Sequence, residues 1–313
     1  MKTQQKVQDD LGLGLQPVLH NQRVINRDGS SNIIRTGTPF FRTADTYNAL
    51  ITMPWSMFTA LIFSAYLIIN IIFAFIYLAI GIQNLDGIKL SNSVFQHFMD
   101  AFFFSAQTIS TVGYGHISPS GLATSFVAAL ESLFGLLSFA LATGLLYGRF
   151  SRPLAKIKYS KNMVVAPYRD ITGLMFRLVN YRSNQLIELE VTVMLTYNAV
   201  VDEKTIRQFI PLQLERNRIS LLTLSWTVVH PITDESPLKT MNEAFLKSSE
   251  AEFLVMLKAF DDGFSQTVHS RTSYTDEEVV WDALFTAAIS RDKNGVNVLE
   301  LDKIDYYEPV YKQ

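Results

Sequence analysis

The sequence predicts a membrane domain of two spanning α-helices with a shorter re-entrant helix between them, followed by a C-terminal β-sandwich. Three features indicate this fold class: two long apolar runs, a short apolar segment between them that ends in a glycine-containing stretch, and alternation of apolar and polar residues in the second half. The 313 residues are 48% hydrophobic and 18% charged, with a mean hydropathy of +0.16, which suits a membrane part joined to a soluble part.

Composition and motifs argue against other classes. A net charge of -2 gives no reason to propose nucleic acid as a partner. Cysteine is absent, so there is no disulfide framework, thiolate metal site or cysteine nucleophile. The GLGLQ stretch near residue 12 follows no predicted strand, and the sequence has no nucleophile elbow, Walker loop or zinc signature. We therefore expect no enzymatic activity and no cofactor.

The two spanning helices are predicted from uncharged runs. Residues 46–85 contain no Asp, Glu, Lys or Arg, and residues 121–148 form a second apolar run that only Glu131 interrupts. Each run exceeds the roughly 20 residues that a helix needs to cross a bilayer. The predicted bounds are 54–82 for the first span, 120–149 for the second and 54–152 for the whole transmembrane domain.

The segment at 97–110 is predicted to be a helix that enters the membrane and returns. As a helix it would reach only about 20 Å, which is too short for a full crossing. It is followed by TVGYG at 111–115. Irregular backbone is tolerated at membrane depth only where protein buries it or where it lines a water-filled path, so the segment indicates such a path.

The TVGYG stretch has the groups needed to bind a dehydrated potassium ion. Four copies could surround the ion with backbone carbonyl oxygens, because glycine lets the carbonyls point inward and Thr111 adds a hydroxyl at the inner end. One chain supplies a quarter of each ring, which implies a homotetramer. The negative end of the preceding helix would face the cavity and favour a cation. The predicted selectivity filter is Thr111, Val112, Gly113, Tyr114 and Gly115, with potassium bound at the first four.

The distribution of basic residues predicts the orientation. The connecting stretch 82–119 carries only Lys89, whereas both flanks of the two spans are basic. The flanking residues are Arg23, Arg27, Arg35 and Arg42 before the first span and Arg149, Arg152, Lys156, Lys158 and Lys161 after the second. By the positive-inside rule both termini are expected to be cytoplasmic.

The second half is predicted to be a β-sandwich domain at 153–313. Apolar and polar residues alternate in LIELEVTVMLTY at 186–197, and further strand-like runs are separated by DG, Pro and Asn. Those runs are GLMFRLVNY, SLLTLSWTVV, AEFLVMLKAF and VNVLEL. One short helix is predicted at 240–249.

Several motifs resemble the inward-rectifier potassium channels, most closely their prokaryotic branch, over nearly the whole chain. They are AFFFSAQTISTVGYG, RVINRDGSSNI, GRFSRP, LMFRLVNYRSNQLIELEV and SRTSYTDEEVVW. The resemblance implies a cytoplasmic N-terminal segment at 1–38, an amphipathic interfacial helix at 39–53 and an immunoglobulin-like cytoplasmic domain that extends the pore. It also implies voltage-independent gating and a place in the plasma membrane of a prokaryote.

Two departures from the animal members concern the surroundings of the filter. Those members carry a Glu in the pore helix and an Arg after GYG, where this chain has Gln107 and His116, and they often have Gln where this chain has Glu131. The acid and the amide have exchanged places, which would make sense if the side chains of Gln107 and Glu131 touch. We hypothesise that Glu131 hydrogen-bonds behind the filter and braces it, since an acid in a span is costly without a partner. The alternative is that Glu131 lies near the headgroups and serves packing alone. Protonated His116 would weaken inward current, unless it is an inconsequential loop residue.

Spacing in the second span predicts a cavity-lining face and a gate. Positions three or four apart share one helix face, and the resemblance implies that this face lines the cavity. The face carries Ser132, Leu136, Phe139, Thr143 and Tyr147. Four copies of Tyr147 would narrow the inner end of the path, with Gly135 and Gly144 as bending or pivot points. The alternative places Tyr147 in the interfacial aromatic belt, facing lipid.

Charged residues suggest lipid and cytoplasmic pore contacts. Arg149, Arg152 and Lys156 leave the membrane at headgroup level, which suits anionic lipid, although they could equally serve only to orient the span. Asp261 and Asp262 are the nearest matches to the acids that line the cytoplasmic pore in animal members, and solvated turn acids are the alternative. Animal members have a pore-lining acid in the second span, and this chain has Phe139 at the matching site. Block by polyamines is therefore expected to be weak.

The sequence is compatible with three functions. The favoured one is a potassium-selective channel of inward-rectifier type, with passive conduction through a homotetrameric pore gated where the inner helices cross. A nonselective or sodium-conducting channel would keep the same architecture. A non-conducting, membrane-anchored β-sandwich sensor would explain the spans and the soluble domain, but not the filter between the spans.

Overall fold

The computed structural model describes residues 22–34, 36, 43–88, 93–152 and 155–310, with only the backbone described for 43–45. It divides into two units. The helical unit comprises residues 37–152, and the β unit comprises residues 1–36 together with 153–313.

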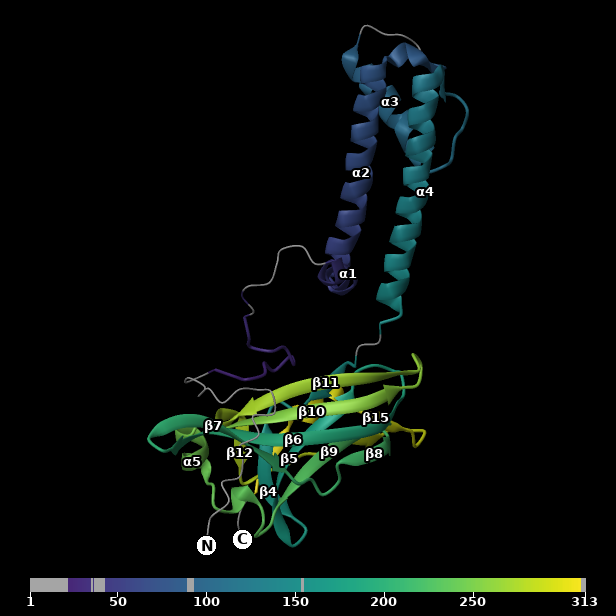
Figure 1. Ribbon diagram of the computed structural model, residues 1–313. Helices are drawn as coiled ribbons and strands as arrows, with labels where there is room; N and C mark the ends of the chain where they lie inside the picture. Colours follow the sequence, from purple (N-terminus) through teal and green to yellow (C-terminus); the bar gives the residue numbers. More distant parts are fainter. Residues whose placement is uncertain (1–21, 35, 37–42, 89–92, 153–154, 311–313) are drawn as a thin grey trace. The chain divides into compact units, whose positions relative to one another are not determined.

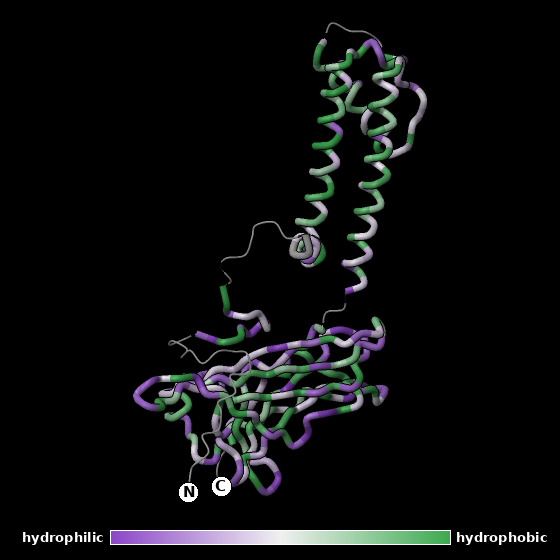
Figure 2. The backbone as a smooth tube through the Cα atoms, viewed as in Figure 1, coloured by the Kyte–Doolittle hydropathy of each residue, from purple (hydrophilic) through white to green (hydrophobic). Residues whose placement is uncertain are grey.

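The described residues of the helical unit form four α-helices (Figure 1). They are α1 (Thr43–Thr52), α2 (Trp55–Ile80), α3 (Val94–Ile109) and α4 (Leu122–Phe150). With 26 and 29 residues, α2 and α4 are about 39 and 44 Å long and apolar enough to cross a membrane, and Figure 2 shows apolar residues along most of both. The 16 residues of α3 reach only about 24 Å, too short to cross.

A small apolar core fixes α3 against α2 and α4. Ala74 and Tyr77 of α2 pack with Ala101 and Phe104 of α3, and Ala128 of α4 completes the cluster. The Tyr77 and Phe104 rings meet edge to face with their centroids 5.0 Å apart. The three helices are therefore joined at the end of the unit where α3 lies (Figure 1).

The helix bounds differ from the sequence prediction by a few residues. The re-entrant helix begins at Val94 and not at residue 97, because the Ser93 side chain accepts a hydrogen bond from the Gln96 amide and caps the helix earlier. The second span begins at Leu122, after Gly121 with φ of 80°. For the interfacial helix predicted at 39–53, the structure describes α1, and residues 39–42 lie outside the described part.

A short strand pair ties the end of α2 to the stretch after the filter. The turn η1 (Ile82–Asn84) leads into β1 (Leu85–Asp86), which pairs antiparallel with β2 (Ser118–Pro119). Gly87, with φ of 90°, lies against the backbone of His116, and an added Cβ would overlap the carbonyl group of His116. Glycine is therefore required here for the two segments to approach.

The β unit is a sandwich of two five-stranded sheets (Figure 1). The first sheet has the order β11-β10-β6-β7, with β8 also pairing with β6. Its strands are β6 (Leu186–Val201), β7 (Lys204–Leu212), β8 (Arg218–Leu221), β10 (Glu252–Asp261) and β11 (Gln266–Thr275). The second sheet has the order β12-β4-β5-β3, with β9 also pairing with β5. Its strands are β3 (Ile157–Tyr159), β4 (Met163–Tyr168), β5 (Ile171–Asn180), β9 (Ser225–Ile232) and β12 (Val279–Trp281).

Apolar side chains from both sheets form one core. Phe176 and Leu178 of β5 are buried together with Leu195 of β6 and with Phe253 and Leu257 of β10. Alternate residues of each strand point into this core, as the sequence pattern predicts for a sandwich. The two apolar helices and this β-rich unit confirm the predicted fold class.

Smaller elements complete the β unit. They are η2 (Pro237–Lys239), α5 (Glu243–Ser248), η3 (Asp276–Glu278), β13 (Ala283–Phe285), β14 (Ile289–Arg291), β15 (Asn297–Leu299), η4 (Leu301–Asp305) and β16 (Tyr307–Pro309). The helix predicted at 240–249 is the shorter α5, because Asn242 caps it by accepting from the Phe245 amide. The run at 220–229, predicted as one strand, is divided between β8 and β9.

A segment from the N-terminal side packs on the first sheet. Ile25 is buried with Met194 of β6 and Leu254 of β10. The backbone amides of Val24 and Ile25 donate to the buried carboxylate of Glu252. The segment is thus part of the β unit.

Candidate ion pathway

The predicted filter begins where α3 ends, and the last turn of the helix holds its backbone. The Val112 amide donates to the Gln107 carbonyl oxygen at 3.0 Å, and the Gly113 amide donates to the same oxygen at 3.4 Å. The Thr111 amide donates to the Thr108 carbonyl oxygen at 3.1 Å. The amide groups of the first three filter residues are therefore turned back toward the helix.

Backbone angles alternate along this stretch. Thr111, Gly113 and Gly115 have φ of 59°, 52° and 78°, whereas Val112 and Tyr114 do not have positive φ. Alternation between left-handed and right-handed backbone turns successive carbonyl groups toward the same side, so the stretch can present a row of oxygens.

Thr111 is the strained member of the row. A β-branched residue in the left-handed region is an outlier, and such a conformation costs on the order of 1–3 kcal/mol. It persists only where the surrounding structure fixes it, as the contact of its amide with Thr108 does here. Since Val112 is 52% and Tyr114 77% exposed in the single chain, the stretch is open on one side.

Behind the filter, Glu131 of α4 is completely buried and bonded to both neighbouring helices. Tyr77 of α2 donates its hydroxyl hydrogen to Glu131 Oε2 at 2.6 Å, and the Ser105 hydroxyl of α3 is hydrogen-bonded to Glu131 Oε1. The Ser105 hydroxyl also lies 3.0 Å from Asn70 Oδ1. One buried polar cluster thus connects α2, α3 and α4.

The hydrogen bonds hypothesised for Glu131 are present, but its partners are Tyr77 and Ser105 and not Gln107. Ser105 lies two residues before Gln107, so the two side chains leave α3 in different directions. Gln107 holds the filter through its backbone carbonyl. Sequence reasoning missed Asn70, Tyr77 and Ser105, although an amide such as Asn70 within an apolar span is itself a signal for a buried partner.

The glycines of α4 have different surroundings. At Gly135 an added Cβ would lie 2.8 Å from the carbonyl carbon of Ile109, and closer still to its oxygen. Gly135 is therefore required for α4 to pass the end of α3, and its role as a bending point stays a prediction. At Gly148 an added Cβ would lie 2.8 Å from the Tyr47 hydroxyl, whereas Gly144 has no atom within 4 Å.

The predicted cavity face is largely open in the single chain. Leu136, Phe139 and Tyr147 are 59%, 72% and 74% exposed, and Thr143 is exposed as well. Ser132 is partly buried. The face is thus available to line a path or to meet another chain.

Arg149 is engaged by the protein itself, which corrects its assignment to lipid. Its two terminal nitrogens donate to the carbonyl oxygens of Leu50 and Met53, each at 2.7 Å, at the end of α1. Its guanidinium group also lies 4.5 Å from the Trp55 ring centroid and 4.4 Å from that of Phe58. Arg149 thus caps carbonyls that a helix end leaves without partners. Arg152 and Lys156 are exposed.

The assignment of Asp261 to the cytoplasmic pore is also wrong, because Asp261 is completely buried and cannot line a water-filled path. Its carboxylate accepts from Asn184 Nδ2 at 2.7 Å and from the amides of Gly263 and Phe264 at 3.1 and 3.3 Å. It therefore organises the turn between β10 and β11. Asp262 is exposed at the same turn and stays a prediction.

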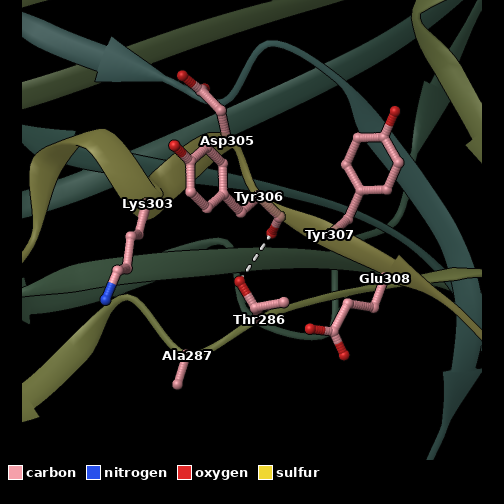
Figure 3. Close-up of a pocket in the computed structure, with 7 residues that line it drawn as sticks. All are labelled: Thr286, Ala287, Lys303, Asp305, Tyr306, Tyr307 and Glu308. Carbon is pink, nitrogen blue, oxygen red and sulfur yellow. Dashed lines mark hydrogen bonds between the residues drawn. The ribbon is translucent and has the colours of Figure 1, made fainter.

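A pocket of roughly 500 Å³ lies in the β unit (Figure 3). Its lining residues are Thr286, Ala287, Lys303, Asp305, Tyr306, Tyr307 and Glu308. The Thr286 hydroxyl donates to the Tyr306 carbonyl oxygen at 3.3 Å. Within the described ranges no group of three or more His, Asp or Glu residues is placed to hold a metal ion.

Comparisons with known proteins agree with this geometry. Residues 157–312 match the family model described as inward rectifier potassium channel C-terminal domain, and residues 61–152 match the one described as ion channel. The chain is 38% identical to inward rectifier potassium channel Kirbac3.1 of Paramagnetospirillum magnetotacticum over 93% of its own length and 97% of that protein. It is 25% identical to ATP-sensitive inward rectifier potassium channel 15 of Mus musculus, over 94% of its own length and 84% of that protein. The chain therefore belongs to the inward rectifier potassium channel family, a family of membrane proteins that are ion channels and not enzymes.

Proposed function

We propose that the chain conducts potassium ions passively and selectively through a pore whose narrowest part is the backbone of residues 111–115. The main support for this proposal is the positive φ at every second residue, Thr111, Gly113 and Gly115, which turns successive carbonyl groups to one side. Such a row can replace the hydration shell of a potassium ion, whereas other cation channels use rings of acidic side chains. The family membership supports the same conclusion.

The pore requires more than one chain, and we propose a homotetramer. One strand of carbonyls covers only one side of an ion, so four symmetric copies are needed to surround it. In the single chain the filter and the Leu136–Phe139 face of α4 are exposed. Apolar surface of this extent beside the filter suits contacts with identical chains and with lipid.

The proposed gate lies at the inner end of α4. Tyr147 and Phe139 are the most exposed large side chains of the predicted face, and four copies could close a path by size and by excluding water. Tyr147 is next to Gly148, which contacts Tyr47 of α1, and near Arg149, which binds the end of α1. A shift of α1 would therefore be passed directly to the gate.

We further propose that the channel lies in the plasma membrane of a prokaryote with both termini cytoplasmic. The basic flanks of the two spans favour this orientation. Arg152 and Lys156, which are exposed, are the candidates for contact with anionic lipid headgroups, and Arg149 is no longer among them.

Ion flux into liposomes tests the proposal. Full-length protein in liposomes should take up potassium far faster than sodium, and barium should stop the uptake. Equal uptake of both ions would support the nonselective channel, and faster sodium uptake the sodium channel. No uptake by well-assembled protein would support the non-conducting sensor. Tyr147→Ala should raise basal potassium uptake without loss of selectivity, and unchanged uptake would contradict the proposed gate.

A further inference from the structure

Four polar side chains lie together in the apolar interior of the helical unit. Asn70 and Tyr77 of α2, Ser105 of α3 and Glu131 of α4 are each at most 1% exposed. Polar atoms buried among apolar helices need hydrogen-bond partners, because no water is available to them. Each contact in the cluster therefore has to contain a hydrogen.

The direction of one contact is fixed by the backbone. Asn70 Nδ2 donates to the Tyr66 carbonyl oxygen at 2.7 Å, and a carbonyl oxygen can only accept. The amide orientation of Asn70 follows from this contact. Its Oδ1 atom, which also only accepts, therefore faces the Ser105 hydroxyl at 3.0 Å, and Ser105 has to be the donor.

The contacts between oxygen atoms need more hydrogens than the hydroxyl groups supply. Three contacts join oxygen atoms: Tyr77 with Glu131, Glu131 with Ser105, and Ser105 with Asn70. Each needs one hydrogen, but the two hydroxyl groups supply only two. Since the Ser105 hydrogen is used toward Asn70 and the Tyr77 hydrogen toward Glu131 Oε2, the third has to come from Glu131 itself.

We propose that Glu131 is held as a neutral carboxylic acid that donates its hydrogen to Ser105 and so positions the re-entrant helix. The hydrogen bonds then run in one direction, from Tyr77 through Glu131, Ser105 and Asn70 to the backbone of Tyr66. A carboxylate would leave two acceptors facing each other and an uncompensated charge among apolar helices. In the described part of the chain no Lys, Arg or His contacts Glu131, and Tyr77 is the one other titratable group that faces it.

The consequence concerns the filter. Ser105 lies on α3 six residues before Thr111, so a fixed donor at Glu131 sets the depth and rotation of the helix whose last turn holds the filter. Glu131 is thus a positioning residue that acts through Ser105, and it contributes no charge to the ion. This inference rests on the proposed function for the role of the filter, but not for the protonation of Glu131.

Infrared spectroscopy tests the protonation directly. Full-length protein in liposomes at neutral pH should show the carbonyl band of a protonated carboxylic acid, and Glu131→Gln should lose that band. A wild-type-minus-variant difference that contains carboxylate bands instead would overturn the proposal. If the acid band is present but the protein passes no potassium, the proposed function fails while this inference stands.

Two variants test the positioning role. Glu131→Gln keeps one donor toward Ser105 and one acceptor toward Tyr77, because its amide nitrogen can donate to Ser105 while its carbonyl oxygen accepts from Tyr77. Glu131→Leu removes both bonds and should lower the selectivity for potassium over sodium and the thermal stability of the assembled protein, and Glu131→Gln should restore both relative to Leu. A Gln variant as impaired as the Leu variant would show that the charge of Glu131 is required, and would overturn the proposal. Tyr77→Phe, which removes one bond only, should have an intermediate effect.

Discussion

Replacing Gly135 with alanine should disturb the contact between α4 and the end of α3. The added Cβ would lie 2.8 Å from the carbonyl carbon and 3.0 Å from the Cα of Ile109. Carbon atoms pack best at about 3.5–4.0 Å, so the two helices would have to separate by about 0.7 Å or more. Both neighbours are backbone atoms, which cannot rotate away as a side chain can.

Two opposing effects set the change in the free energy of unfolding that Gly135→Ala causes. Overpacking of this kind costs about 1–3 kcal/mol, whereas alanine in a helix is favoured over glycine by about 1 kcal/mol. Gly135→Ala should therefore destabilise each chain by up to about 2 kcal/mol. Because Ile109 immediately precedes the filter, the displacement should also lower the selectivity for potassium over sodium.

Gly144→Ala is the matched control, since an added Cβ there meets no atom of its own chain within 4 Å. The assays are thermal stability of the purified full-length protein and the potassium-to-sodium selectivity of uptake into liposomes. Gly135→Ala should be less thermally stable and less selective for potassium than Gly144→Ala. If the two variants are equally stable and equally selective, the close approach of α4 to α3 does not support the filter, and the reasoning is refuted.

Three further predictions follow from the contacts of single side chains. Arg149→Gln should lower stability and potassium uptake equally in neutral and anionic liposomes, because Arg149 binds α1 carbonyls; a loss seen only with anionic lipid would restore its lipid assignment. Burial lowers the pKa of His230 below its ordinary 6.5, so the unfolded chain takes up a proton first as the pH falls. The unfolding free energy of the full-length protein should therefore decrease below about pH 6.5, and a decrease just as steep in His230→Gln would exclude His230 as the cause. Asp261→Asn should destabilise the protein by about 1–3 kcal/mol without changing spermine block, whereas only Asp262→Asn could change that block.

The architecture was predictable because it depends on patterns along the chain. The two spans, the short helix between them and the β-sandwich follow from the length and period of apolar residues, which local sequence contains. The unusual backbone of residues 111–115 was predictable for the same reason, since its glycines permit a conformation that few other sequences adopt. Helix ends were less accurate, because one capping side chain such as Ser93 moves them.

The side-chain partners were less predictable, because they depend on how helices pack. Glu131 was identified as an acid in need of a partner, but Tyr77 and Ser105 are 54 and 26 residues away in sequence. Arg149 has the position expected of a lipid contact, and only the placement of α1 shows that both of its terminal nitrogens already donate to backbone carbonyl oxygens. Asp261 lies in a stretch whose composition is typical of a solvated turn. Its burial involves Asn184, which comes from a distant loop and donates to its carboxylate.

The central claim is that the row of carbonyls at residues 111–115 selects potassium. The most direct measurement is the reversal potential of the full-length protein in a planar bilayer, with potassium on one side and an equal concentration of sodium on the other. A large reversal potential of the sign that potassium permeation sets is expected. A reversal potential near zero, or one of the sign that sodium permeation sets, would contradict it.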